Sequence, residues 1–480
     1  MSSRTRFRHL TVVPLWVRRP ARVTTAVVGA VALGLLAGCS SSGSSSSSAG
    51  TPGSTASSTA ASASPSVTVE AGGSCGSTNA TKITFWAWVP GMGRAVNEFN
   101  KTHPNICVTQ EDVGAGDPEY VAITNALKAG SGAPDVAEVE FDELPSFEIT
   151  HNVVNLVPYG ANNYKSDFTT WAWDEVSQGP AVYAMPGDAG PVAFYYNSAL
   201  LAKYHITPPT TWAQFATDAA ALHKDDPGAY MTNFSAVDLQ WVMSLMAQDN
   251  AWPFAYSGGS NVTIKWTGPA QMAFAKYWQD LLSAHEVNAT TDVSATSFAD
   301  LDKGIDASWI SSAWGPSYFA PDAKSSIGNW RATALPQWTP GANVAANWGG
   351  STYPVFSQSK HPAQAAQFAE WLNGTTASWN ITKTAPSSLF PTFLPLLNDP
   401  SFKDITVPLS GTSTPDVAFS AAASQIQGVP WPPFMTEALN EASTVFAGVM
   451  NGKETLQAAF TNFQNVLVSY AKQQGFNVST

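Results

Sequence analysis

Tryptophan and acidic residues follow several stretches of this chain that have strand character. Trp88 and Trp314 each come at the end of such a stretch, and Glu140 and Asp142 close a third. Because the carboxyl ends of parallel strands meet at one edge of a sheet, these side chains can converge there. An indole face packs on apolar C–H surfaces, and a carboxylate accepts hydrogen bonds from hydroxyl groups. The combination would suit a ligand that presents both apolar C–H faces and hydroxyl groups.

Seven more residues are candidates for the same site. They lie at turns, at loop ends and near the start of a helix: Asp188, Asn233, Trp241, Trp348, Gly349, Gly350 and Trp431. Each candidate also has a purely structural interpretation. Asp188 could cap its own turn, a tryptophan could belong to a core, and acidic residues could form a solvated face.

A carboxylate pair across a tryptophan-lined cleft could instead hydrolyse glycosidic bonds. Glu140 or Glu143 with Asp188 would form that pair if the carboxylates lay about 5–10 Å apart. The sequence lacks the strand-by-strand repetition of a barrel. It also contains no Gly-x-x-x-x-Gly-Lys phosphate loop, no His-Glu-x-x-His and no paired-cysteine zinc spacing. We therefore expect binding without catalysis, and neither a metal nor a cofactor.

Alternating strand and helix patterns must position these residues. We expect strands over 82–88, 106–110, 135–141 and 192–196. Expected helices cover 94–102, 120–129, 212–223, 237–248, 271–284, 360–372, 435–450 and 455–474. Thr211 has the type and position of a helix N-cap. This alternation predicts parallel sheets with helices on both faces.

One stretch joins two expected strands through a flexible turn. Its pattern comprises Pro186, Asp188, Tyr195-Tyr196-Asn197 and then Pro209-Thr-Thr-Trp212. It resembles the first crossover of the extracellular solute-binding proteins of carbohydrate ABC transporters, a group similar to maltose- and oligosaccharide-binding proteins. The stretch from Leu301 to Trp314 further resembles the family's short helix, strand and cleft tryptophan. The resemblance covers nearly everything from Lys82 to the C-terminus.

The resemblance implies a two-lobed α/β fold of the periplasmic-binding-protein-like type II. Each lobe would be a mostly parallel sheet flanked by helices, and hinge crossovers would join the lobes. Lobe 1 would comprise 79–187 and 336–378, and lobe 2 would comprise 188–335 and 379–480. The second crossover would fall at 330–336, and the chain would cross again from about residue 379.

The family's function gives further expectations. A neutral sugar or oligosaccharide would bind between the lobes and pass to the permease subunits of an ABC transporter, with Trp314 as an aromatic platform on lobe 2. We expect a monomer. A binding subunit of a membrane sensor is an alternative that the sequence leaves open.

The chain has few charged residues, and acidic residues outnumber basic ones. Only 12% of the 480 residues are charged and the formal net charge is −12. Six arginines precede Cys39 while no acidic residue does, so the rest of the chain is still more acidic. This balance argues against nucleic acid or an anionic membrane surface as a partner. A polar surface with few charges suits a neutral ligand.

Residues 1–38 have the order of a lipoprotein signal peptide. Arginines precede an apolar run that is shorter than the ~20 residues of a spanning helix. Leu36-Ala37-Gly38-Cys39 resembles a bacterial lipobox, so Cys39 would carry acyl chains such as palmitate and anchor the protein to the outer face of the cytoplasmic membrane. Residues 39–78, rich in Ser, Gly and Ala, would form a flexible tether.

Two further cysteines, Cys75 and Cys107, remain in a chain expected outside the cell. An oxidising compartment and the absence of metal-ligand spacing favour a disulfide between them. The chain-entropy relation gives it ~3–4 kcal/mol of stabilisation for a loop of this length. Two unpaired buried thiols are the alternative.

Overall fold

The computed structural model describes residues 73, 75–384, 389–400, 402, 409, 419 and 422–480, all of which belong to the unit Ser62–Thr480. The expected signal peptide, Cys39 and most of the expected tether lie outside the described residues. In the described part of the chain, no helix combines the length and the apolar character needed to cross a membrane.

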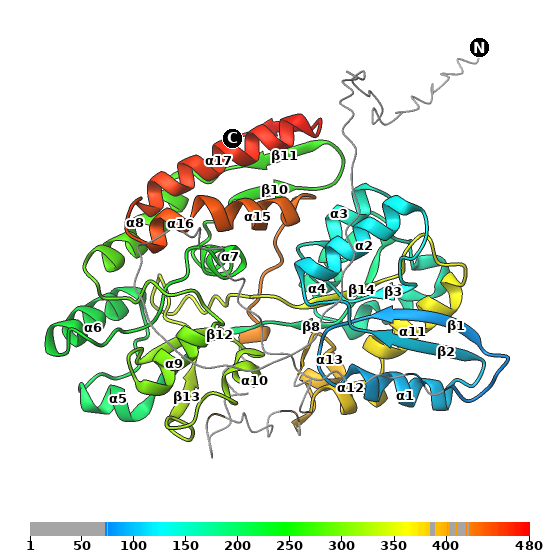
Figure 1. Ribbon diagram of the computed structural model, residues 1–480, viewed down its shortest axis with the longest axis horizontal. Coiled ribbons are helices and arrows are strands. Elements are labelled where there is room, and N and C mark those ends of the chain that lie inside the picture. The colour runs from blue at the N-terminus through cyan, green and yellow to red at the C-terminus, as the bar shows by residue number, and fades with distance from the viewer. Residues whose placement is uncertain are drawn as a thin grey trace, which may run out of the picture. The chain divides into compact units, whose positions relative to one another are not determined.

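The elements form two lobes, which confirms the expected two-lobed α/β fold. We define lobe 1 as the elements from β1 to β7 together with β14 and α11 to α13, and Figure 1 draws it mainly in blue, cyan and yellow. We define lobe 2 as the elements from β9 to β13, including α5 to α10, together with α15 to β16; it is mainly green and red in Figure 1.

Lobe 1 begins with the expected strand, helix and strand. Its elements are β1 (Thr81–Trp86), α1 (Met92–Thr102), β2 (Ile106–Glu111), α2 (Asp117–Ala129), β3 (Val136–Ala137), β4 (Val139–Glu140), α3 (Leu144–Ile149), α4 (Thr170–Glu175), β5 (Ser177–Gln178), β6 (Ala181–Val182), β7 (Ala184–Pro186), β14 (Ser351–Pro354), α11 (Pro362–Gly374), α12 (Thr376–Thr382), β15 (Phe390–Pro391) and α13 (Leu394–Leu397). Two short 3-10 helices, Val157–Tyr159 and Ala161–Asp167, precede α4. Alternate residues of β1, Ile83 and Phe85, point into the core.

Lobe 2 is built around a sheet with the strand order β12-β9-β13. Its elements are β9 (Val192–Asn197), α5 (Ser198–Lys203), α6 (Trp212–Asp225), α7 (Leu239–Gln248), β10 (Phe254–Tyr256), β11 (Asn261–Ile264), α8 (Pro269–Ser283), α9 (Ala295–Lys303), β12 (Ser308–Ser312), α10 (Gly315–Phe319), β13 (Trp330–Thr333), α15 (Met435–Val445), α16 (Ala447–Met450), α17 (Leu456–Gln473) and β16 (Asn477–Ser479). Thr211 caps α6 as expected, since its side chain accepts from Gln214 N at 3.1 Å.

The sheets are less parallel than expected. Parallel pairing joins β1 to β2 and β3, and β11 to β16. The strands next to the crossovers pair antiparallel: β14 with β4 and β7, and β9 with β12 and β13. Among its described residues, lobe 1 thus has one parallel and one antiparallel three-stranded sheet, and the β12-β9-β13 sheet of lobe 2 is antiparallel rather than mostly parallel as expected. β7 carries the chain out of lobe 1 and β14 carries it back, so these two strands run in opposite directions.

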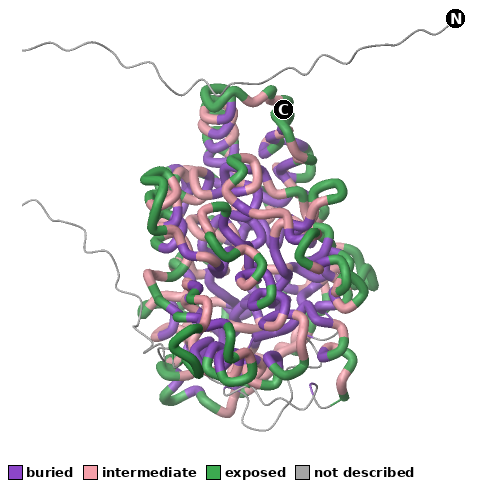
Figure 2. The backbone as a smooth tube through the Cα atoms, turned by 90° about the vertical axis from the view of Figure 1, so that its right-hand side faces the viewer, coloured by how far each residue is buried: buried purple, intermediate pink, exposed green. Residues whose placement is uncertain are grey.

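The face alternation of β9 divides its side chains between two hydrophobic clusters. Val192 and Phe194 belong to the cluster that includes α6, α7 and α8. Ala193 and Tyr195 belong to the cluster that extends from lobe 1 and also contains Trp309 of β12. Both faces of the lobe 2 sheet are therefore covered, and the buried residues form continuous stretches through the interior (Figure 2).

Two chain segments cross between the lobes side by side. Gly187–Pro191 carries the chain from β7 to β9, as the sequence predicted. The return lies at Asn347–Gly350 rather than at 330–336, because Trp330–Thr333 is strand β13 of the lobe 2 sheet. Trp348 N donates to Gly190 O at 2.8 Å. A Cβ at Gly190 would clash with the carbonyl oxygen of Trp348, so this close approach requires glycine.

The last lobe 2 segment was expected to start at about residue 379, but the described residues that follow this position first pack on lobe 1. Trp379, Phe390 and Phe393 are buried in the same cluster as β1 and α11. The chain joins the second cluster only with Phe434 and Met435. We therefore propose that lobe 2 resumes near residue 431, since α12 and α13 cover lobe 1 first.

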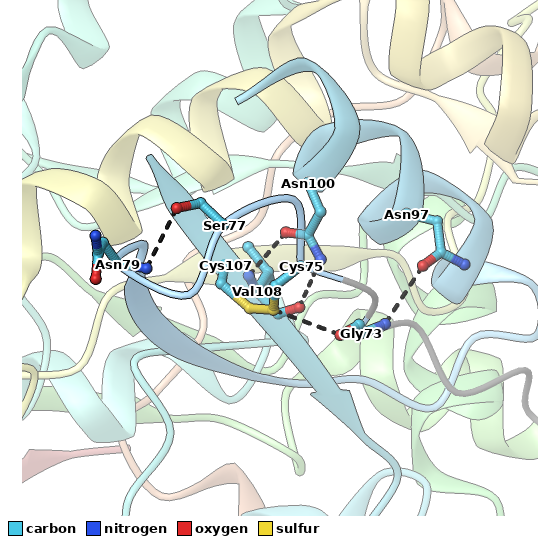
Figure 3. The surroundings of a disulfide bond; sticks show 8 residues. All are labelled: Gly73, Cys75, Ser77, Asn79, Asn97, Asn100, Cys107 and Val108. Atoms are coloured by element: carbon cyan, nitrogen blue, oxygen red, sulfur yellow. Dashed lines mark hydrogen bonds between the residues drawn. A yellow bond between two sulfur atoms is a disulfide. The ribbon is translucent and has the colours of Figure 1, made fainter. Parts of the chain in front are cut away.

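A disulfide joins Cys75 to Cys107, whose Cα atoms are 5.3 Å apart (Figure 3). The bond ties the segment that precedes β1 to β2. Next to it, the buried Asn100 amide pairs with the β2 backbone: Nδ2 donates to Val108 O at 2.9 Å, and Oδ1 accepts from Val108 N at 2.8 Å. Helix α1 and strand β2 are thus fixed to each other next to the disulfide.

Candidate functional site

Carboxylates from lobe 1 gather where β4 ends and α3 begins. Glu140, Asp142 and Glu143 follow one another closely in sequence, and Asp142 and Glu143 are only 3% and 1% exposed. Glu140 Oε2 accepts from the Tyr120 hydroxyl at 3.0 Å, and Glu140 N donates to the same hydroxyl at 3.1 Å. The sequence analysis overlooked Tyr120, which lies on the inner side of α2. We name Glu140, Asp142 and Glu143 the acidic triplet.

Lobe 2 meets the acidic triplet with neutral donors. Gln240 of α7 donates from Nε2 to Asp142 Oδ2 at 2.7 Å and to Glu140 Oε2 at 3.4 Å. Thr436 of α15 donates from Oγ1 to Glu143 Oε2 at 2.6 Å. These hydrogen bonds link elements far apart in the chain. Neither donor was a sequence candidate, because nothing local marks a Gln or Thr on an amphipathic helix as a binding group.

The crossover brings two of the predicted tryptophans together. Trp314 donates from Nε1 to the carbonyl oxygen of Trp348 at 3.0 Å, and their rings are 4.5 Å apart in an edge-to-face arrangement. A Cβ at Gly349 would lie 3.3 Å from Trp314 Nε1 and 3.5 Å from Glu140 Oε1. The Trp314 indole of lobe 2 and the Glu140 carboxylate of lobe 1 therefore face the same point of the backbone. Trp314 is half-buried, whereas Trp348 is buried.

Gly349 and Gly350 have positive φ angles of 77° and 106°, which favour glycine. A Cβ at Gly350 would approach the carbonyl oxygen of Asp188 to 2.9 Å. Asp188 itself is buried, and its Oδ1 accepts from Ser351 N at 3.1 Å. These residues hold the two crossovers against each other.

Trp88 packs against Tyr120, whose hydroxyl donates to Glu140 of the acidic triplet. The centroids of the Trp88 and Tyr120 rings are 6.0 Å apart. The position of Trp88 depends on Glu138, a fully buried residue that the sequence analysis did not single out. Glu138 Oε2 accepts from the backbone N–H groups of Trp88 and Val89, at 3.1 and 3.2 Å. Its other oxygen accepts from Ser351 Oγ at 2.9 Å. One carboxylate thus connects the loop that carries Trp88 to the crossover.

A cavity of about 850 Å³ lies next to this region and is lined by both lobes. Lobe 1 contributes Trp171, Glu148 and Glu175, and lobe 2 contributes Tyr256 of the β10–β11 hairpin. Trp431, a sequence candidate, also lines the cavity, and its Nε1 donates to Glu175 Oε2 at 3.0 Å. Phe141 lies between Glu140 and Asp142 in the sequence. Its ring centroid is 5.3 Å from that of Trp171.

The sequence analysis missed Trp171, Tyr256 and Glu175. Trp171 and Glu175 lie in the short helix α4, whose TWAWDE sequence concentrates aromatic and acidic residues. That local concentration is a signal that could have found them. Tyr256 ends a strand that the sequence analysis did not expect.

Burial without cationic partners shapes the electrostatics of this region. Desolvation raises the pKa of Asp142 to about 6 and of Asp188 to about 7. It also raises the pKa of Glu175 to about 8 and of Glu148 to about 7. The hydrogen bonds that Asp142 and Glu175 accept oppose this change but do not cancel it.

Two candidates lie away from the site. Trp241 is 1% exposed in the second cluster, and its Nε1 donates to Ile310 O at 3.0 Å, so its indole has no surface for a ligand. Asn233 is buried and donates to Thr290 O at 3.4 Å. Both residues support the interior of lobe 2. Among the described residues, no group of three or more His, Cys, Asp or Glu side chains is arranged to hold a metal ion.

Comparison with known proteins places this architecture in a family. The chain is 23% identical over 326 residues to the arabinooligosaccharide-binding protein of Bacillus subtilis (strain 168), covering 63% of this chain and 71% of that protein. A protein of the same name from Halalkalibacterium halodurans is 23% identical over 302 residues, which cover 60% of this chain and 66% of its own length.

A solved structure shows the same fold over nearly the whole described chain. It is the ABC transporter associated binding protein from B. animalis subsp. lactis Bl-04, in complex with beta-1,6-galactobiose. It is 27% identical, with a TM-score of 0.73, and the match covers 84% of this chain and 100% of that one. The family model of the bacterial extracellular solute-binding proteins matches residues 89–378, more than half of the sequence. The protein belongs to the bacterial extracellular solute-binding proteins.

Proposed function

We propose that this solute-binding protein captures a sugar or oligosaccharide between its lobes and delivers it, chemically unchanged, to the permease subunits of an ABC transporter. The observation that carries the proposal is the cavity of about 850 Å³, which places aromatic rings from both lobes beside carboxylate acceptors. Aromatic rings pack on the C–H faces of a sugar, and carboxylates accept from its hydroxyl groups.

The volume fits a small oligosaccharide better than a single small metabolite, since it lies near the upper end of the ~300–1,000 Å³ typical of small-molecule sites. The relatives support the same class of ligand. Two are named for arabinooligosaccharides, and the similar solved structure holds a galactobiose.

Closure of the lobes would follow from a ligand that touches both of them. The lobes already meet through Gln240 and Thr436 on one side of the cavity. On another side, the β10–β11 hairpin approaches lobe 1, because a Cβ at Gly258 would lie 2.6 Å from Gln178 Nε2. A bound sugar that contacts Trp171 and Tyr256 would favour this closed arrangement over an open one.

The proposal is tested with the purified protein and a panel of mono-, di- and trisaccharides. Calorimetry should find a ligand with a dissociation constant near micromolar, about −8 kcal/mol. Trp431→Ala should weaken binding by roughly tenfold through loss of aromatic stacking. Trp371→Ala is the control, since this half-buried tryptophan of α11 is not among the residues that line the cavity.

Product analysis in the same experiment tests whether the protein acts as an enzyme. We expect every oligosaccharide to be recovered intact. Time-dependent appearance of reducing ends, abolished by Asp188→Asn, would instead favour hydrolysis and would contradict the proposed binding role.

We further propose that the protein is a monomer anchored outside the cytoplasmic membrane by acyl chains on Cys39. Membership in an extracellular family agrees with an extracytoplasmic location, and Leu36-Ala37-Gly38-Cys39 supports the anchor. Cys39→Ala should release the protein from membranes or leave it unprocessed, as seen by fractionation and intact mass. Recovery of this variant in the lipid-modified membrane fraction would contradict the anchor.

A further inference from the structure

The surface that lobe 1 presents to lobe 2 contains many carboxylates and no cationic counterpart among their described partners. The acidic triplet, Glu148 and Glu175 are hydrogen bonded only to neutral groups or to none. None of the described residues that line the cavity is Lys, Arg or His. The ion pairs found in the described part of the chain involve other residues, such as Lys276 with Asp280.

Two deeply buried carboxylates of the acidic triplet keep an oxygen without any hydrogen-bond donor. These atoms are Asp142 Oδ1 and Glu143 Oε1. Their second oxygens accept from Gln240 and Thr436, which are neutral. A buried acceptor without a partner is costly, because it has lost its water and gained nothing in exchange. This part of the lobe 1 surface therefore has more hydrogen-bond acceptors than the protein supplies donors for.

Glu148 brings the same condition to the wall of the cavity. It is half-buried on α3, lines the cavity, and accepts no hydrogen bond from any described residue. Tyr256 stands near it from the other lobe, since the charge of Glu148 contributes to the raised pKa of the Tyr256 phenol. A ligand group next to Glu148 would thus contact both lobes.

We propose that the site selects carbohydrates that carry a protonated amino group over the same carbohydrates without one, and that it rejects sugars bearing carboxylate or phosphate groups. This inference rests on the proposed carbohydrate-binding function. An ammonium group donates three hydrogen bonds and supplies the missing positive charge, whereas a hydroxyl supplies one donor and no charge. An anionic sugar would meet like charges in a site of low polarity. The acidic surface thus refines the expectation of a neutral ligand, which rested on the composition of the whole chain.

Raised pKa values agree with this assignment. Without a cation nearby, burial raises the pKa of Glu148 to about 7 and of Glu175 to about 8. An adjacent ammonium would favour the ionised carboxylates, so its binding should release protons. A sugar that carries only hydroxyl groups should release fewer.

The test compares matched disaccharides that share one skeleton. Cellobiose, its fully amino-substituted counterpart (deacetylated chitobiose) and its uronic acid form (cellobiuronic acid) are titrated by calorimetry at pH 7, alongside glucose, glucosamine and glucuronic acid. We expect the amino sugar of each set to bind at least about tenfold more tightly than the neutral one, and the acid to bind most weakly. Titration in two buffers of different ionisation enthalpy should show proton release for the amino sugar.

Glu148→Gln is the decisive variant, because it removes the charge without removing any hydrogen bond of the protein. It should lower the preference for the amino sugar over the neutral sugar about fivefold or more. Glu98→Gln is the control, since Glu98 pairs with Lys101 on the surface of α1. A neutral sugar that binds as tightly as its amino counterpart would overturn the inference and leave the proposed function intact. Failure of every carbohydrate to bind would overturn both.

Discussion

The two lobes present different chemistry to each other. Lobe 1 supplies acceptors, the acidic triplet above all, while lobe 2 supplies neutral donors from Gln240 and Thr436. Each lobe keeps its large apolar side chains inside: Trp241 belongs to one cluster and Phe85 to the other. The hydrogen bonds that the acidic triplet accepts from lobe 2 can therefore be exchanged for bonds to water, whereas the apolar contacts inside the clusters cannot. This division suits a protein whose lobes must separate and close without unfolding.

The largest effect should come from a tryptophan that is interior rather than interlobe. Trp241→Ala should lower the free energy of unfolding by about 3–5 kcal/mol, because it leaves a cavity in the second cluster and removes the hydrogen bond to Ile310. Trp314→Ala, at a half-buried position between the lobes, should cost far less stability and should mainly weaken ligand binding. Chemical denaturation of both variants measures this difference. Equal losses of stability would place Trp314 in the interior and remove the distinction between core and interlobe surface.

A smaller loss is expected where the crossovers touch. Gly190→Ala should destabilise the protein by about 1–3 kcal/mol, since its methyl group cannot fit beside the carbonyl oxygen of Trp348. Gly228→Ala is the matched control: a Cβ there would meet Asp226 Oδ1 at 3.6 Å, and Gly228 is not among the positive-φ glycines. Unfolding curves of both variants test the prediction. A fully stable Gly190→Ala protein would show that the crossovers can separate at no cost.

The acidic surface of lobe 1 should make the unliganded protein less stable as the pH rises. Burial raises the pKa of Asp142 to about 6, of Glu148 to about 7 and of Glu138 to about 8. A raised folded-state pKa stabilises the protonated form, so this contribution is fully present below about pH 4 and is lost as the pH rises to about 8. We expect a loss of at least about 2 kcal/mol over this window, since each unit of pKa difference corresponds to about 1.4 kcal/mol for one group. Melting temperatures at pH 5 and 8 test it, and Asp142→Asn should flatten the change. Melting temperatures equal at both pH values would contradict the electrostatic account.

Replacing Gln240 tests the hydrogen bonds between the two lobes at a single residue. Gln240→Leu removes both donors to Glu140 and Asp142, so it should weaken ligand-linked closure by about 1 kcal/mol, roughly fivefold in affinity. Gln473→Leu, at the exposed end of α17, is the control. Gln279→Leu would not serve, because Gln279 Oε1 accepts a hydrogen bond from Leu456 N. X-ray scattering with saturating ligand should show a less compact Gln240→Leu protein. An unchanged affinity and scattering profile would show that lobe 2 donors do not hold the closed form.

Local sequence patterns predicted most of the helices and the first crossover. The Thr211 cap could be predicted because its side-chain oxygen accepts from the N–H group of Gln214, only three residues away in the chain. Gly187–Pro191 reads as a turn because glycine and proline restrict the backbone locally. The second crossover was misplaced because strand β13 forms by pairing with β9, more than a hundred residues earlier. That partner cannot be seen in a short window of sequence.

The site shows the same limit. Rules about strand ends selected Glu140, Asp142, Trp314 and Trp348, which the structure brings into one region. Trp241 was a candidate from its position near the start of a helix, and a helix carrying a tryptophan reads alike whether the ring faces a ligand or a core. Gln240 lies one residue away on α7 and reaches lobe 1. Which of the two neighbours faces the other lobe depends on how α7 packs on the β12-β9-β13 sheet, and only the assembled lobe shows this.

A crystal structure of the protein with a bound amino disaccharide tests the central claim most directly. We predict that the sugar occupies the cavity of about 850 Å³, with its rings against Trp171 or Trp431 and its amino group beside Glu148, and that it touches both lobes. A sugar bound to one lobe alone, or outside this cavity, would contradict the account of capture between an acidic lobe 1 and a neutral lobe 2.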